Sequence, residues 1–228
     1  MHCTTKDYDK IYQPWLRNAT SLLDLASYNH VEHSLLDLCG GTGAVSVTAL
    51  RRRKRSQGSY EGKPVVLMDL VPRQDTHVKE KAYIDGVAQD LNEYPWPVLS
   101  QAPFDVVVCR QALGYIRSLP DFFAEVAKQT ARGSLFAFNT FTKPPFIRTK
   151  STRMDGGRYW EIGVSFFGRV LHLQKAVPSA YIPKTFWDVS CFRYHSEKKI
   201  RKALQKHWCF NVQREGSSLR FLCTPKGD

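Results

Sequence analysis

The sequence predicts an α/β protein built around a doubly wound, mostly parallel sheet. Residues 35–43, Leu-Leu-Asp-Leu-Cys-Gly-Gly-Thr-Gly, form a short apolar run that breaks into glycines and is followed at once by a helical pattern. Strand and helix patterns alternate from there to residue 141, which is typical of parallel strands joined by crossover helices. Two late apolar runs, separated by a turn that begins at Gly216, predict an antiparallel closing pair. We therefore expect a seven-stranded sheet with an antiparallel last strand.

Each element has its own signal in the sequence. The run at 64–70 is apolar up to Asp69, as expected for a strand covered on both faces. The helix after the glycines, at 44–55, ends in five basic residues, and Ser196 is a candidate N-cap of a late helix at 196–206. The first strand is expected to begin at Leu35 and to end at Asp37, and the other predicted strands lie at 83–88, 104–110, 133–141, 209–213 and 218–223, with a further helix at 119–130.

Composition is that of a folded globular protein. Of the 228 residues, 43% are hydrophobic and 24% charged. No apolar run approaches the ~20 residues of a transmembrane helix. The polar start of the chain lacks a signal-peptide core, so we expect a soluble, cytoplasmic protein without a membrane partner. The cysteines are scattered and the histidines lack metal-ligand spacing, so no metal is predicted.

Positive charge is unevenly distributed along the chain. The net charge is +12; residues 1–139 hold 16 Lys and Arg against 15 Asp and Glu, whereas residues 140–228 hold 17 against 6. The later part is expected to attract an anion, although a basic, solvated surface without a ligand is the alternative. The basic run at 51–55 suits a helix C-terminus, and a nucleic-acid patch or import signal is its alternative interpretation.

The glycine turn is the strongest sign of a ligand. Gly40, Gly41 and Gly43 let the backbone approach a ligand at the amino end of the following helix. Asp37 would repel a pyrophosphate and attract a sulfonium or ammonium group. Asp69, at the end of the second strand, is placed to accept hydrogen bonds from ribose hydroxyls. A nicotinamide oxidoreductase is disfavoured by Asp37 and by Ser46, which replaces the third glycine of the dinucleotide pattern.

These residues resemble the first motif of class I S-adenosylmethionine (SAM)-dependent methyltransferases, which reads close to Asp-Leu-Gly-Cys-Gly-Thr-Gly. Cys39 replaces one glycine. The resemblance covers nearly the whole chain and implies a Rossmann-like fold with SAM as cofactor. It further implies that Asp90 approaches the adenine amino group and that Leu91 covers the ring. Tyr8 and Tyr12 match a segment that folds over the cofactor, with core packing as the alternative. The predicted cofactor contacts are Asp37, Cys39, Gly40, Gly41, Gly43, Asp69, Leu70, Asp90, Leu91, Arg110, Gln111, Tyr8 and Tyr12.

We expect one domain over residues 1–228, with a helical cap at about 1–30 and an insertion at about 142–190. Within the insertion, a basic, proline-containing loop precedes two strands at 158–166 and 169–177, and this hairpin resembles the substrate lid of small-molecule methyltransferases. His172 or Glu161 is a candidate base, with a surface role as the alternative. The predicted substrate contacts are Tyr115, Asn139, Tyr159, Trp160 and Gln174.

The predicted function is transfer of a methyl group from SAM to an oxygen or nitrogen of a small metabolite by direct displacement, with anionic or aromatic substrates favoured. A nucleic-acid methyltransferase would explain the net charge of +12, yet Asn139-Thr-Phe-Thr lacks the prolines of the amino-methylating DNA enzymes and no Pro-Cys motif is present. A SAM-binding protein without catalysis is the other alternative, because the motifs bind cofactor and perform no chemistry.

Overall fold

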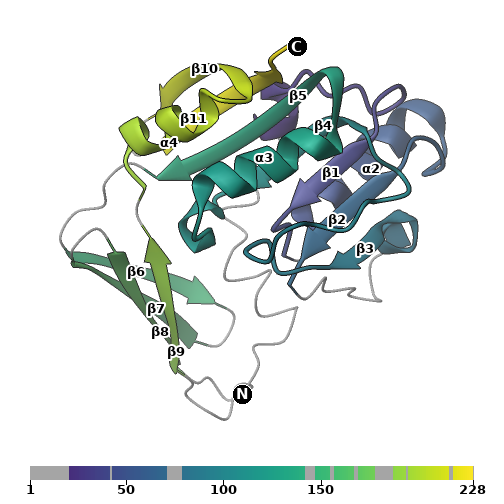
Figure 1. The fold of residues 1–228 in the computed structure, drawn as a ribbon. Helices are drawn as coiled ribbons and strands as arrows, with labels where there is room; N and C mark the ends of the chain where they lie inside the picture. The colour runs from purple at the N-terminus through teal and green to yellow at the C-terminus, as the bar shows by residue number, and fades with distance from the viewer. Residues whose placement is uncertain are drawn as a thin grey trace.

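The computed structural model describes residues 21–41, 43–70, 79–141, 147–154, 157–166, 169–177, 187–193, 195–215 and 218–227, with backbone alone at 79, 81, 141 and 147–193. Two sheets are present in this part of the chain (Figure 1). The main sheet has seven strands in the order β10-β11-β5-β4-β1-β2-β3, and the second has four in the order β6-β7-β8-β9. The described helices include none long and apolar enough to cross a membrane.

The main sheet confirms the predicted doubly wound arrangement. Its first five strands pair in parallel, and β11 pairs antiparallel with both β5 and β10. The strand order reverses between β1 and β4, which are neighbours in the sheet. The strands are β1 (Leu35–Leu38), β2 (Val65–Asp69), β3 (Asp85–Ala88), β4 (Phe104–Arg110), β5 (Thr130–Phe141), β10 (Trp208–Glu215) and β11 (Ser218–Pro225).

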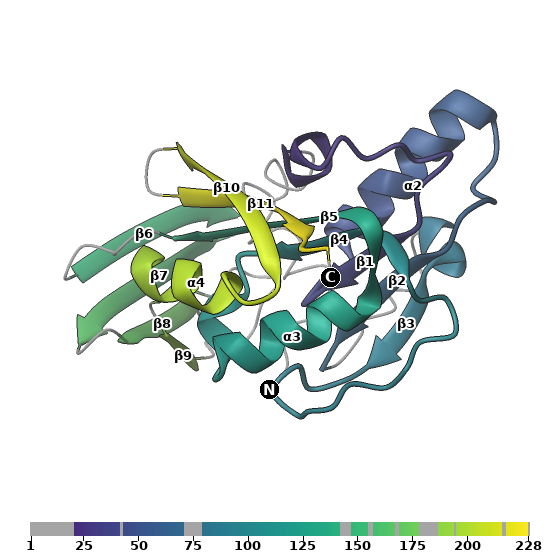
Figure 2. The same ribbon diagram turned by 45° about the horizontal axis from the view of Figure 1, so that its top comes forward.

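Helices cover both faces of this sheet. Figures 1 and 2 show α3 (Leu119–Gln129) and α4 (Glu197–Leu204) on one face and α2 (Ala44–Gln57) on the other. The alternation of side chains along β1 fits this arrangement, since Leu36 packs in the core on the α3 side and Leu35 in the core on the α2 side. The continuous apolar runs of the central strands follow from burial on both faces.

Two short 3-10 helices and the chain start complete the main domain. The helix η1 (Lys79–Tyr83) precedes β3, and η2 (Leu113–Tyr115) follows β4. The predicted strand at 83–88 therefore begins two residues later than expected. Residues 21–25 are helical, and the part of the predicted N-terminal cap before residue 21 lies outside the described residues.

The second sheet is larger than the predicted hairpin. Strands β7 (Gly157–Phe166) and β8 (Arg169–Val177) form the expected antiparallel pair. However, β6 (Ile147–Met154) lies where a loop was expected, and β9 (Trp187–Arg193) was not predicted. The run 147–154 alternates little in hydrophobicity, so its pairing with β7 is what defines it as a strand. The sheet lies beyond the C-terminal end of β5, and β9 contacts η2 (Figures 1 and 2).

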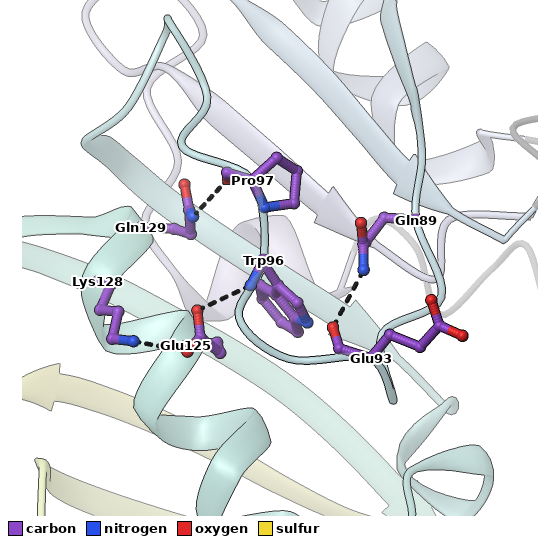
Figure 3. Close-up of polar contacts among 7 residues, drawn as sticks. All are labelled: Gln89, Glu93, Trp96, Pro97, Glu125, Lys128 and Gln129. Carbon is purple, nitrogen blue, oxygen red and sulfur yellow. Dashed lines mark hydrogen bonds and ion pairs between the residues drawn. The ribbon is translucent and has the colours of Figure 1, made fainter.

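A long connection between β3 and β4 is fixed to α3. Figure 3 shows the backbone N–H of Trp96 donating to Glu125 at 3.2 Å, while Lys128 pairs with the same carboxylate at 2.6 Å. Gln129 donates to the carbonyl of Pro97 at 3.3 Å. The Trp96 ring is buried and meets Phe122 edge to face, with 5.5 Å between centroids. These contacts hold in place the connection that begins at the C-terminal end of β3.

Candidate functional site

The glycine turn, residues 39–43, leaves β1 at the point where the strand order reverses. Gly41 and Gly43 have φ of 57° and 79°, and residues other than glycine rarely adopt such positive values. Gly43 is the N-cap residue of α2, so the turn leads directly into the helix N-terminus. Cys39 has φ of 53°, and its N–H donates to the carbonyl of Met68 on β2 at 2.8 Å. The turn therefore presents its backbone at the C-terminal edge of the sheet.

Asp37 is buried beneath the turn. Its Oδ2 accepts hydrogen bonds from the backbone N–H of Ser46 at 3.2 Å and from the Ser46 hydroxyl at 2.8 Å. Its Oδ1 has no hydrogen-bond partner among the described residues. Burial raises the pKa of Asp37 to about 6, against the opposing effects of the Ser46 hydrogen bonds and the Arg110 charge. The carboxyl is therefore mostly ionised at neutral pH, and one of its oxygens is buried without a hydrogen-bond partner among the described residues.

The turn packs directly on this carboxyl. A Cβ atom at Gly40 would lie 2.9 Å from Asp37 Cγ, 2.9 Å from its Oδ2 and 3.0 Å from Leu67 Cδ1. Such distances are too short for real side chains, so position 40 requires glycine on steric grounds.

Asp69 joins the end of β2 to the same turn. Its Oδ2 accepts a hydrogen bond from the N–H of Gly41 at 2.9 Å. The predicted cofactor acids, Asp37 and Asp69, thus lie on neighbouring strands with the glycine turn between them. Leu70, the next residue, is 64% exposed.

The ends of β4 and β5 form the other side of this edge. Gln111 follows β4 with φ of 54°, and its N–H donates to Asn139 on β5, both to the main-chain oxygen and to Oδ1. Asn139 is buried and half-buried Arg110 lies opposite it in register. The structure therefore brings Gln111 and Asn139 together, as their strand-end positions predicted.

Asp90 and Tyr115 are linked through a residue that the sequence did not single out. Asn92 donates from its N–H and its Nδ2 to Asp90 Oδ1, at 2.9 and 3.1 Å. The same Nδ2 donates to the carbonyl of Tyr115 at 3.2 Å. Leu91 is buried in the hydrophobic core, whereas Tyr115 is 51% exposed. The short spacing Asp-x-Asn was the available signal, because Asp side chains often accept the N–H two residues on.

Several predicted site residues lie outside what the structure describes. Tyr8 and Tyr12 fall outside the described residues, and for the insertion only the backbone is described. Its register places Glu161 opposite Gln174 and Gly163 opposite His172. Tyr159 and Trp160 likewise lie on β7, opposite Ala176 and Lys175. The predicted roles of these side chains remain predictions.

Ser46 and Cys109 are site residues that sequence reasoning missed. Ser46 was read only as a missing glycine, yet its hydroxyl is the main polar partner of Asp37. The Cys109 thiol hydrogen bonds with Cys39, and this contact together with burial raises the pKa of Cys39 well above its usual value. The Cys39 thiol is therefore a poor nucleophile. Among the described residues, no group of three or more His, Cys, Asp or Glu could hold a metal ion.

The parallel sheet, its reversal between β1 and β4, the glycine turn and the two strand-end acids together define the class I, Rossmann-like methyltransferase fold. Residues 9–207 match the model of a family described as "Methyltransferase domain", and the chain belongs to this family. Enzymes of this class take their methyl group from SAM, and the chain is a SAM-dependent methyltransferase.

Solved structures show the same fold at low sequence identity. An S-adenosylmethionine-dependent methyltransferase from Clostridium acetobutylicum ATCC 824 has a TM-score of 0.70 and 16% identity, with 96% of each chain covered. DesVI from Streptomyces venezuelae gives 0.74 and 17%, covering 99% of this chain and 100% of that one. SAM-bound CalS10, an amino pentose methyltransferase from Micromonospora echinaspora, gives 0.71 and 15%, covering 99% of each. A search of curated proteins found no match.

Proposed function

We propose that the chain transfers a methyl group from SAM to an oxygen or nitrogen of a small metabolite. The observation that carries this proposal is the pair of carboxylates at the glycine turn, held by Ser46 and Gly41. Support for a small substrate comes from CalS10, which acts on an amino pentose and matches this chain over 99% of both lengths. The second sheet β6–β9 is the proposed substrate lid, because it lies at the C-terminal edge where ligands bind.

Three features of the described residues support SAM as the cofactor. Asp37 offers a buried oxygen without a hydrogen-bond partner among the described residues, which suits a cationic group. Asp69 lies at the end of β2, where a carboxylate can accept hydrogen bonds from ribose hydroxyls. Gly40 and its neighbours allow the backbone to approach the cofactor closely. SAM, when bound, supplies a methyl group activated by its sulfonium, so the protein's task is to orient the acceptor and exclude water.

The proposed cofactor site is tested by calorimetric titration with SAM, S-adenosylhomocysteine and NADH. We expect the wild type to bind the two adenosyl-sulfur ligands. Asp69→Ala should lose this binding, because the N–H of Gly41 loses the carboxylate that accepts its hydrogen bond. Asp85→Ala is a matched control, since Asp85 starts the neighbouring strand β3 at its opposite end. Binding of NADH alone would refute the cofactor and indicate an oxidoreductase.

Turnover assays test the residues that are proposed to act on the methyl-accepting atom. His172 and Glu161 are proposed to take a proton from the nucleophile or to hydrogen bond to it. We expect His172→Ala or Glu161→Gln to lower kcat by about 10²-fold or more while SAM affinity stays unchanged. Unchanged turnover in both variants would remove the two residues from the mechanism. The screen includes RNA, for which a steep salt dependence of binding would favour the nucleic-acid alternative.

A further inference from the structure

Two residues other than glycine have left-handed backbones at the proposed cofactor site. Cys39 follows β1 with φ of 53°, and Gln111 follows β4 with φ of 54°. Because β1 and β4 are hydrogen-bonded neighbours, both residues lie where the strand order reverses. Residues with side chains persist in this conformation only when surrounding contacts hold them, and they are concentrated at functional sites.

The two strand ends are held from opposite directions. The N–H of Cys39 donates to Met68 on β2, whereas the N–H of Gln111 donates to Asn139 on β5. Since β2 and β5 flank the β1–β4 pair on opposite sides, the two chains diverge as they leave the sheet. Diverging connections at such a reversal create the crevice in which α/β proteins bind their ligands.

Asn139 holds the β4 side of this crevice with two acceptors. The N–H of Gln111 lies 3.2 Å from the main-chain oxygen of Asn139 and 3.0 Å from its Oδ1. Asn139 is 2% exposed, and its register neighbours are Arg110 on β4 and Arg220 on β11. The buried side chain of Asn139 therefore restrains the backbone of Gln111 through this hydrogen bond.

We infer that Asn139 is a positioning residue, whose buried carboxamide oxygen holds Gln111 in the left-handed conformation that shapes the β4 side of the cofactor site. This role is distinct from the predicted substrate contact of Asn139, which stays a prediction, and it rests on the proposed cofactor site. Without Oδ1, the N–H of Gln111 keeps only the longer bond, and its backbone relaxes toward the negative φ that side chains favour.

Three variants of the full chain test the role of the oxygen. Asn139→Leu keeps the branched shape and removes the acceptor, Asn139→Asp keeps an acceptor, and Thr140→Val is a control at the adjacent, equally buried position of β5. With S-adenosylhomocysteine as the probe, we expect Asn139→Leu to raise Kd about tenfold, as a weakened buried hydrogen bond implies. Asn139→Asp and Thr140→Val are expected to stay within about twofold of the wild type. The Gln111 amide should also exchange its hydrogen faster in Asn139→Leu, as measured by NMR.

A double substitution separates positioning from a merely structural role. Glycine adopts the left-handed conformation readily, so Gln111→Gly should make the acceptor dispensable. We expect Asn139→Leu to raise Kd much less in the Gln111→Gly background than in the wild type. An equal loss in both backgrounds would overturn the inference, as would wild-type Kd for Asn139→Leu alone. The melting temperature of each variant is measured as a control for folding. Asn139→Ala replaces Asn139→Leu if the latter does not fold.

Failure of this inference differs from failure of the proposed function. A wild type that binds S-adenosylhomocysteine while Asn139→Leu binds it equally well refutes only the role of Asn139. A wild type that does not bind S-adenosylhomocysteine refutes the cofactor site, and the positioning role with it.

Discussion

Gly40→Ala is the sharpest test of how the glycine turn is built. Gly40 lies outside the left-handed region, so adding a methyl group there probes packing alone. The new Cβ would meet Asp37 Oδ2 at 2.9 Å, and that oxygen cannot turn away without breaking its hydrogen bonds with Ser46. Overpacking costs ~1–3 kcal/mol and a lost charged hydrogen bond ~1.5–3 kcal/mol, so we expect the free energy of unfolding to fall by about 2.5–6 kcal/mol.

Urea denaturation and titration with S-adenosylhomocysteine measure the two consequences of this substitution. Gly58→Ala is the matched control, because Gly58 has φ of 73° but no atom within 4 Å of the added Cβ. It should lose about 1 kcal/mol through backbone strain and keep the wild-type affinity. Gly40→Ala should lose both stability and affinity. Wild-type stability and affinity in Gly40→Ala would show that the turn does not pack on Asp37 as described.

Two further predictions concern buried charges. Because the pKa of Asp37 is raised to about 6, the folded state binds its proton more tightly than the unfolded state, so this stabilisation is full below about pH 4 and declines as the pH rises to 6. Asp37→Asn should therefore remove about 3 kcal/mol of pH dependence between pH 4 and 6 in urea titrations, and an unchanged slope would contradict the assignment. Arg53 is buried and donates to three backbone carbonyls, so Arg53→Leu should lower the free energy of unfolding by about 3 kcal/mol. Exposed Arg55→Ala should change it by less than about 0.5 kcal/mol, and equal effects would refute the structural role of Arg53.

The parallel part of the fold was predictable because its strands are buried on both faces. The run Phe104–Arg110 was predicted with both ends correct, because it is an apolar run bounded by turn residues. The first strand was expected to end at Asp37, and β1 ends one residue later, at Leu38. The acids Asp37 and Asp69 followed from position alone, because the C-terminal ends of parallel strands meet at one edge. Sequence position therefore identified the proposed cofactor side of the site.

The contacts that hold these residues were less readable. Ser46 lies nine residues from Asp37 and Asn139 lies 28 residues from Gln111, so only the folded sheet shows that they are bonded. The strand β6 escaped prediction because its sequence is polar at most positions and its pairing with β7 defines it. Contacts distant in sequence and strands without hydrophobic alternation are set by tertiary structure.

The basic run at 51–55 shows how tertiary contacts decide between two interpretations of one pattern. Arg51 pairs with Glu80 at 3.0 Å and Arg52 with Asp24 at 2.8 Å, while Arg53 is buried. Most of the run is thus committed to anchoring α2 against its neighbours, which favours the structural interpretation over a nucleic-acid patch. Most of the excess positive charge lies after residue 139, where 17 basic residues face 6 acidic ones, in the part of the chain that includes the second sheet. The expected attraction of an anion therefore stays a prediction for that part of the chain rather than for α2.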